Sequence, residues 1–190
     1  MKNRAMVEAN GLLKATIPLL AGMLLCDAGQ AQDKVSIDRT FTAPRTATQD
    51  VDLLNGKAAV SIDPNLWKEM KPPEIDRRTF RHVSGHGYAV FISEQIELSL
   101  DQVRQIALDN AHEAAPDIRI IEEQRRRVNG TDVLLLRLEG NTSGAAVTYL
   151  GYYYGGPEGM VRVFTYTGQN LFQKYRRDFE DLLNGFRLKE

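Results

Sequence analysis

The stretch that decides the fold is residues 118–167, IRIIEEQRRRVNGTDVLLLRLEGNTSGAAVTYLGYYYGGPEGMVRVFTYT. It is rich in β-branched and aromatic residues, and glycine-containing turns divide it into segments of strand length. Asn129-Gly130 tolerates the positive φ angles of a two-residue hairpin turn. Because the connections are short, neighbouring strands must be antiparallel. We therefore expect four consecutive antiparallel strands, at Ile118–Val128, Thr131–Glu139, Ala145–Tyr154 and Met160–Thr167.

One helix is predicted before this stretch and one after it. Ser99 begins the first helix with a capping box, in which Gln102 reaches back to the backbone of Ser99, and Pro116 stops the helix. The second helix runs from Asn170 to Asn184, and Gly185 sits where a C-cap glycine belongs. Both segments have apolar residues at helical spacing on one side, so each helix should cover a sheet.

A further hairpin is expected upstream. Val51–Leu54 and Lys57–Ile62 flank Asn55-Gly56, a second sequence that fits a two-residue turn. Residues 68–79 should form a polar loop, and Tyr88–Ser93 should form another strand. The order β-β-β-α-β-β-β-β-α predicts an α+β fold, an antiparallel β-sheet covered by two helices.

The first 31 residues have the three-part order of a cleavable signal peptide. Lys2 and Arg4 precede the apolar run Ala15–Leu25, and Gly29-Gln30-Ala31 resembles a signal-peptidase site. The apolar run is too short to anchor the chain in a bilayer. We therefore expect a periplasmic or secreted protein with a signal peptide at 1–31, a flexible tether at 32–49 and a single domain at 50–190.

Cys26 is the only cysteine, and it leaves an alternative open. Bacterial lipoproteins carry a lipid-modified cysteine directly after such an apolar run, so Cys26 could anchor the protein to a membrane. The preceding Leu25 is bulkier than the usual Gly, Ala or Ser, which favours free secretion. Cleavage after Ala31 would leave no thiol, and hence no disulfide, thiolate nucleophile or sulfur metal ligand.

The charge of the chain argues against some classes of partner. The net charge is −1 at pH 7, which provides no general attraction to nucleic acid or anionic lipid. We expect no nucleic-acid partner, and contact with a membrane only through the signal or a lipid anchor. The sequence has no phosphate-binding glycine loop and no nucleotide fingerprint, so we expect no cofactor.

Several local sequences, in this order, resemble the PsbP-like superfamily and, within it, the exported DcrB-like bacterial proteins. They are Ile62–Trp67 after the early hairpin, the helix that begins at Ser99, the turn Val128-Asn129-Gly130, the tyrosine-rich strand and the closing Leu182–Phe186. The likeness covers residues 50–188 and implies a PsbP-like sandwich of sheet and helices. Members are mostly binding, assembly or chaperone-like proteins without a shared catalytic centre, so the resemblance implies no catalytic residues.

The tyrosine-rich strand is the main candidate for a binding surface. Alternation places Tyr149 and Tyr153 on one face and Tyr152 and Tyr154 on the other, and Tyr166 is expected on the next strand. One face would be core, and the other would present aromatic rings with polar tips, which suit a peptide, lipid or sugar. We predict binding through Tyr149, Tyr152, Tyr154 and Tyr166, with an envelope protein or peptide, or a lipid, as the partner.

Two other functions remain open beside the leading hypothesis of an exported, non-enzymatic binding or assembly protein of the bacterial envelope. A serine hydrolase would use Ser84 with His82, His86 or His112, although the sequence lacks Gly-x-Ser-x-Gly. A carrier of a small apolar ligand would need a closed apolar cavity between sheet and helix. No metal site is expected, because His82 and His86 would lie about 13 Å apart on a strand.

Overall fold

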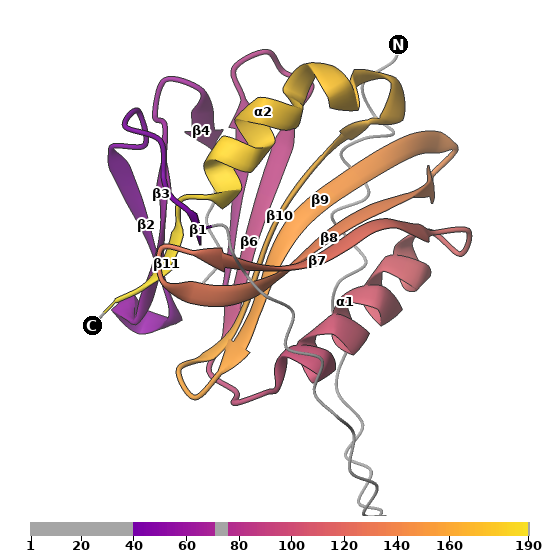
Figure 1. Cartoon of the computed structure of the whole chain (residues 1–190). Helices are drawn as coiled ribbons and strands as arrows, with labels where there is room; N and C mark the ends of the chain where they lie inside the picture. Colours follow the sequence, from indigo (N-terminus) through magenta and orange to yellow (C-terminus); the bar gives the residue numbers. More distant parts are fainter. Residues whose placement is uncertain (1–39, 71–75, 190) are drawn as a thin grey trace, which may run out of the picture.

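The structure is a computed structural model, and it describes residues 40–70 and 76–189. These residues form three layers (Figure 1). An eight-stranded sheet lies in the middle, with helix α1 (Leu100–Ala114) on one face. Helix α2 (Phe172–Leu183) and a separate three-stranded sheet cover the other face. The predicted signal peptide at 1–31 and the lipidation alternative at Cys26 lie outside the described residues.

The large sheet contains the four strands predicted at residues 118–167, all confirmed. Its neighbouring strands are antiparallel, except that β1 pairs parallel with the end of β7. In order across the sheet, its strands are β1 (Thr40–Phe41), β7 (Arg119–Val128), β8 (Thr131–Thr142), β9 (Ala145–Gly156), β10 (Gly159–Gly168), β6 (Tyr88–Glu94), β5 (Arg77–His82) and β4 (Trp67–Glu69).

The turns explain why β7, β8 and β9 form a meander. Asn129 and Gly130 have φ angles of 46° and 83°, and Val128 pairs with Thr131, so the predicted two-residue turn is confirmed. Ser143-Gly144 makes a second turn of this kind, with φ angles of 50° and 79°, although the sequence predicts a longer connection between Glu139 and Ala145. β8 therefore continues to Thr142, beyond its predicted end at Glu139. β9 begins at Ala145 as predicted and continues to Gly156 instead of ending at Tyr154.

The early hairpin forms, but it does not join the large sheet. β2 (Gln49–Leu53) and β3 (Ala58–Ile62) pair with the last strand, β11 (Phe186–Leu188), in the order β11-β3-β2. The expected two-residue turn is wrong, because Leu53 pairs with Ala58 and a 3-10 turn at Leu54–Gly56 lies between them. The prediction of one sheet covered by two helices therefore needs correction to two sheets.

Gly185 follows α2 as predicted, but close approach to another strand explains why it is glycine. A Cβ atom at this position would lie 2.0 Å from the carbonyl oxygen of Ser61 in β3. The backbone of Gly185 accepts a hydrogen bond from the Ser61 N–H at 2.9 Å. This contact lets β11 pair with β3, so the end of α2 is attached to the small sheet.

The predicted polar loop at 68–79 is wrong over most of its described length. β4 and β5 pair with each other there, and β5 continues the sheet beyond β6. Their sequences are rich in charge, and Arg78 and Glu69 form an ion pair across the two strands. Only Trp67, Phe80 and His82 turn into the core, which is too sparse a pattern to indicate strands.

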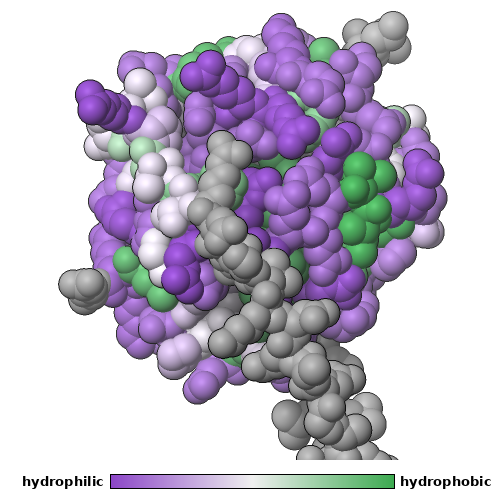
Figure 2. All heavy atoms as spheres, viewed as in Figure 1, coloured by the Kyte–Doolittle hydropathy of each residue, from purple (hydrophilic) through white to green (hydrophobic). Residues whose placement is uncertain are grey.

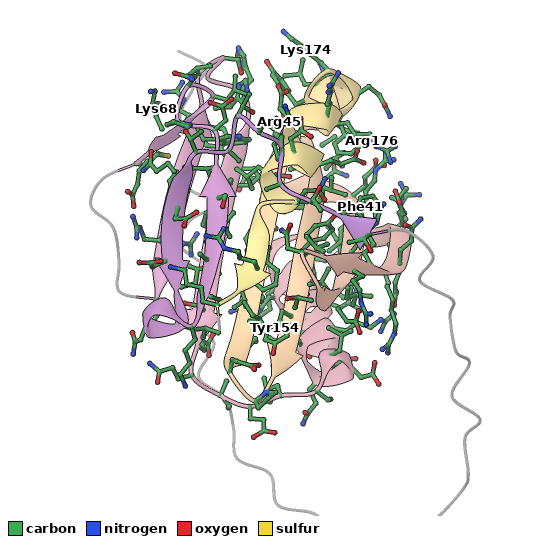
Figure 3. The ribbon with its side chains drawn as sticks, turned by 60° about the vertical axis from the view of Figure 1, so that its left-hand side comes forward. Phe41, Arg45, Lys68, Tyr154, Lys174 and Arg176 are labelled. Carbon is green, nitrogen blue, oxygen red and sulfur yellow. The ribbon has the colours of Figure 1, made fainter. Side chains whose placement is uncertain are left out.

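The first residues that the structure describes contact β7 and the turn after it. The backbone of Asn129 donates to the carbonyl oxygen of Phe41 at 2.9 Å. The guanidinium of Arg126 lies 4.6 Å from the centre of the Phe41 ring. Phe41 is labelled on β1 in Figure 3. These contacts fix β1, which lies within the stretch 32–49 that the sequence analysis assigned to a tether.

Two hydrophobic cores fill the spaces between the layers. The larger core joins α2 and the small sheet to the large sheet, and Phe179, Leu135 and Tyr152 lie at its centre. The smaller core lies under α1, where Val103 is fully buried against Leu136. The capping box that begins α1 is confirmed, because Ser99 and Gln102 each accept from the backbone of the other. Burial of each large side chain contributes about 1.5–3 kcal/mol.

Neither described helix is both long and apolar enough to cross a membrane. The face of the molecule drawn in Figure 2 is mostly hydrophilic, with small hydrophobic patches between the hydrophilic residues. Such scattered patches are normal for a folded domain.

Candidate binding hollow between α1 and the large sheet

Helix α1 covers only part of its face of the large sheet. It packs against β8 and β9, whereas β10, β6 and β5 continue beyond these two strands in the sheet order. At the margin of α1 lies a partly open hollow of about 70 Å³. Its floor is made by side chains of the sheet, and one wall is made by the small residues Ala107, Ala111 and Ala114 of α1.

The floor of the hollow is built from cross-strand rows. Residues directly opposite in an antiparallel pair share a face of the sheet. One row places Tyr149, Tyr166 and Tyr88 side by side, on β9, β10 and β6. In the adjacent row, Phe164 lies between Gly151 and Val90. The alternation that the sequence predicts therefore brings aromatic residues of three strands together.

These aromatic side chains contact one another as a cluster. The rings of Tyr88 and Tyr166 are stacked, with centroids 5.1 Å apart and planes 15° apart. The Tyr149 ring lies 5.8 Å from Tyr166 and 6.5 Å from Phe164. Tyr166 is buried, whereas Tyr88, Tyr149 and Phe164 are half-buried although no helix covers all of them. An apolar surface with polar tips is therefore open at the hollow.

Gly151 makes room for the Phe164 side chain and the Tyr153 ring. A Cβ atom at residue 151 would lie 2.7 Å from the Phe164 side chain and 3.1 Å from the Tyr153 ring. Any side chain at this position would push Phe164 away from the floor. A glycine at position 151, in the middle of a long apolar strand, therefore allows these aromatic side chains to occupy the floor of the hollow.

Arg162 is the most unusual residue of the hollow. It occupies the third cross-strand row, between Tyr153 and Ile92, and only 7% of its surface is exposed. One guanidinium nitrogen donates to Glu94 at 3.1 Å, but Nε has no hydrogen-bond partner in the part of the chain that the structure describes. Burial lowers the pKa of Arg162, Glu94 opposes this shift, and the charge of nearby Arg77 adds to it.

The tyrosines of the hollow are neutral at physiological pH. Burial raises the pKa of Tyr149, although a hydrogen bond with Thr142 at 3.0 Å partly opposes the shift. Burial also raises the pKa of Tyr166 above its usual value, and Tyr88 acts in the same direction. The hollow therefore offers neutral phenol rings beside buried positive charge.

The four predicted binding tyrosines divide between the two faces of the sheet. Tyr149 and Tyr166 line the hollow, whereas Tyr152 and Tyr154 belong to the core beneath α2 and the small sheet. Tyr152 is 1% exposed and Tyr154 is 7% exposed. Tyr154 is labelled in Figure 3. The strand alternation separates the four rings as predicted, but the face that carries Tyr152 and Tyr154 is the one that forms core, so the predicted binding role of these two tyrosines is wrong.

The buried tyrosines have structural partners. The Tyr152 hydroxyl donates to Asn184 at 2.8 Å and accepts from Arg126 at 3.2 Å, and the Tyr154 hydroxyl donates to Glu158. Burial raises the pKa of Tyr152, and the same effect acts on Tyr154. These bonds satisfy polar tips that would otherwise be costly to bury.

Ser84 and His82, the residues of the hydrolase alternative, do approach each other. The Ser84 hydroxyl lies 2.8 Å from Nδ1 of His82, and Nε2 of His82 lies 3.3 Å from Asp178 of α2. Burial lowers the pKa of His82, and Asp178 partly opposes the shift. The backbone N–H of Ser84 also bonds Nδ1, at 3.2 Å, as in a local turn.

The other two histidines do not complete this arrangement. The side chain of His86 is exposed in the same turn, and only its backbone N–H bonds Ser84, at 3.4 Å. His112 lies in the last turn of α1, on the opposite side of the large sheet. Ser84 itself is exposed and outside the hollow. Residues 40–70 and 76–189 contain no group of three or more metal-ligating side chains.

The comparison with known structures bears on the fold. No family model matches the chain, and no curated protein matches its sequence. The solution structure of cyanobacterial PsbP (CyanoP) from Synechocystis sp. PCC 6803 superposes with a TM-score of 0.53. The match has 12% identity and covers 74% of this chain and 92% of that protein. The chain has the PsbP-like fold.

A second structure agrees with this conclusion. The Ran-binding protein Mog1p of Saccharomyces cerevisiae matches with a TM-score of 0.54 and 8% identity, over 74% of this chain and 94% of Mog1p. The predicted resemblance to the PsbP-like group is therefore confirmed as a likeness of fold. The narrower resemblance to DcrB-like proteins stays a prediction, and the PsbP-like fold by itself assigns no function.

Two of the four predicted binding tyrosines line the hollow. The aromatic pattern indicated Tyr149 and Tyr166, and Phe164 was expected on the same strand as Tyr166, but nothing indicated Arg162 or the alanines of α1. An arginine within the apolar strand MVRVFTYT is a signal that was available, because buried arginines are rare without a specific role. The alanine wall gave no signal, since alanine suits any helix.

Proposed function

We propose that the protein is an exported, non-catalytic binding protein of the bacterial envelope, and that it accepts an apolar or aromatic group of its partner in the hollow beside α1. The observation that carries this proposal is the aromatic cluster Tyr149, Phe164 and Tyr166, left partly open at the margin of the helix. Binding sites are typically concave, mostly apolar and furnished with a few polar groups.

The geometry favours binding over catalysis. The rings and alanines of the hollow offer contact area, and its tyrosines are held neutral by burial. The position of the hollow at the edge of a helix suits a group that projects from a larger partner. The volume of about 70 Å³ is far below the 300–1,000 Å³ of pockets that enclose a whole drug-sized ligand.

The structural neighbours support a binding role. Mog1p is described as a Ran-binding protein, so a protein with this fold binds another protein. This supports a protein or peptide partner for the present chain, and the hollow is where such a partner would place an aromatic side chain. The proposal that the protein is exported depends on the sequence of residues 1–31. Cell fractionation, together with a mass measurement of the mature chain, tests this part of the proposal.

A direct test fills the hollow without removing any of its aromatic contacts. Ala111→Leu adds a branched side chain on the α1 wall, and Gln105→Leu adds the same side chain on an exposed part of α1. We expect the neutral probe 3-phenylpropan-1-ol to bind the wild-type protein and the control in calorimetry, but not Ala111→Leu. Equal binding by all three proteins, or by none, would refute the proposed function.

A second candidate function is hydrolysis at Ser84, because His82 and Asp178 approach it in the order of a nucleophile, base and orienting acid. Hydrolysis of p-nitrophenyl acetate tests this alternative. Turnover that disappears in Ser84→Ala and His82→Gln would establish it. A rate unchanged by both substitutions would show that the contact only shapes the turn between β5 and β6.

A further inference from the structure

We infer that the protein forms a symmetric dimer, in which the outer edge of β7 pairs antiparallel with the same edge of a second copy. The pairing segment is residues 122–126, EEQRR, and its centre is Gln124. The residues that line the hollow come from α1 and the strands β5, β6, β8, β9 and β10. The surface on β7 is therefore separate from the hollow, and the inference goes beyond the proposed function.

The first step is that most of the outer edge of β7 has no neighbouring strand among the described residues. β8 pairs with the inner edge along nearly all of β7, whereas β1 covers the outer edge only at Arg127 and Val128. Helix α1 packs mainly over β8 and β9, and α2 packs mainly over β9 and β10. The margin at β7 extends beyond these contacts, and an open edge of this kind is a template for a further strand.

The second step is the direction of the backbone groups on this edge. Val128 closes a two-residue turn with β8, so its N–H and C=O groups point toward β8, and those of every second residue point outward. The hydrogen bond from the Asn129 N–H to Phe41 of β1 agrees with this alternation. The same alternation directs the N–H and C=O groups of Glu123 and Arg125 to the open edge.

The third step is the order of the charges along the segment. Glu122 and Glu123 precede Gln124, and Arg125 and Arg126 follow it. When two copies pair antiparallel about Gln124, Glu123 of each copy lies directly opposite Arg125 of the other, and Glu122 lies opposite Arg126. Residues that lie opposite each other share a face of the sheet, so every such pair brings unlike charges together. The segment is therefore complementary to itself.

The more exposed pair supplies most of this complementarity. The side chains of Glu123 and Arg125 are 34% and 52% exposed, and they form ion pairs with Arg104 and Asp101 of α1. A carboxylate accepts several hydrogen bonds and a guanidinium donates five, so both side chains can bond a second copy while they keep these partners. Arg126 is only 8% exposed and already bonded within its own chain, so its pair adds less.

The two ends of the segment favour the register centred on Gln124. β1 occupies the outer edge at Arg127, and a bulge between Ile120 and Glu122 bends β7 at the other end. In this register the bulge of one copy lies where β1 of the other copy begins. The strand of the second copy therefore turns away at the point where it would otherwise meet β1.

Disulfide formation across the two-fold axis tests this register. Gln124 would lie opposite its own copy in a non-hydrogen-bonded pair, with Cα atoms about 4.5 Å apart. A disulfide spans Cα distances of about 4.4–6.8 Å, so Gln124→Cys should give a covalent dimer on mild oxidation. Arg127→Cys is the matched control, because it is exposed on the same strand but would lie about 20 Å from its copy. Both proteins carry Cys26→Ser, which removes the only native cysteine.

The Gln124→Cys variant is expected to fold, because Gln124 is exposed. Crosslinking of both cysteine variants to the same extent, or of neither, would overturn the inference. Pairing of this edge with residues that precede Thr40, or with an unrelated protein, would give the second of these results.

Charge reversal tests the complementarity without a new cysteine. Glu123→Arg and Arg125→Glu each place like charges opposite one another at two sites of the dimer, so each should weaken self-association about tenfold in sedimentation velocity. An equimolar mixture of the two variants has unlike charges at both sites and should dimerise as the wild type does. Arg177→Glu, whose arginine is 92% exposed on α2, is the control and should leave self-association unchanged.

Two results of the sedimentation experiment would contradict the inference. A mixture that associates as weakly as the separate variants would show that these charges act only within each chain, through their contacts with α1. A wild-type protein that stays monomeric up to its highest soluble concentration would show that the edge of β7 does not pair with a second copy.

Discussion

Replacement of Gly151 by alanine tests whether the floor of the hollow is built as described. The new Cβ atom would lie 2.7 Å from the Phe164 side chain, 3.1 Å from the Tyr153 ring and 3.1 Å from the carbonyl oxygen of Val163. The last of these is backbone and cannot move freely. Overpacking of this kind costs about 1–3 kcal/mol, and the reduced freedom of the unfolded chain offsets about 0.4–1 kcal/mol of it.

The net expectation for Gly151→Ala is therefore a loss of about 1–2 kcal/mol, which corresponds to a fall in Tm of about 2–8 °C for a chain of this size. Gly168→Ala is the matched control, because its nearest neighbour is the end of the Asn170 side chain at 3.1 Å, which can rotate away. Chemical denaturation gives both free energies. A Gly151→Ala protein as stable as the wild type would refute the proposed role of this glycine.

Three further predictions concern the fold on either side of the sheet. Ser99→Ala should remove the cap of α1 and cost about 1 kcal/mol in denaturant unfolding, and no loss would contradict the role of the capping box. Tyr152→Phe should cost about 1–3 kcal/mol, because it leaves Asn184 and Arg126 without their shared hydroxyl. His82 is held neutral by burial, which lowers its folded-state pKa. Its unfolded state then binds more protons, so stability should fall as the pH falls below about 6.5, and His82→Gln should flatten that dependence.

The parts of the fold that sequence alone predicted are those decided by local signals. Asn129-Gly130 and the alternation in β7 to β10 depend on residues near one another in the chain, as does the capping box at Ser99. The parts that were missed depend on distant partners. The early hairpin forms its own sheet because β11 returns beside β3 after Gly185, a contact between residues more than a hundred positions apart.

The candidate site divides in the same way. Aromatic alternation in β9 and β10 indicated Tyr149 and Tyr166, but it could not show which face of the strands α2 would cover. Tyr152 and Tyr154 were therefore included, although the structure buries them with α2 and the small sheet. The hollow also needs Ala111 from α1 beside Arg162 from β10, and no local pattern reports where a helix margin meets a sheet.

The most direct test of the central claim is a titration of isotope-labelled protein with 3-phenylpropan-1-ol, followed by the backbone amide signals in NMR. The account predicts that the largest shifts fall on residues of the hollow, such as Gly151, Phe164 and Ala111, with little change at Ser84. Shifts confined to the turn at Ser84, or spread evenly over the domain, would contradict a binding site between α1 and the large sheet.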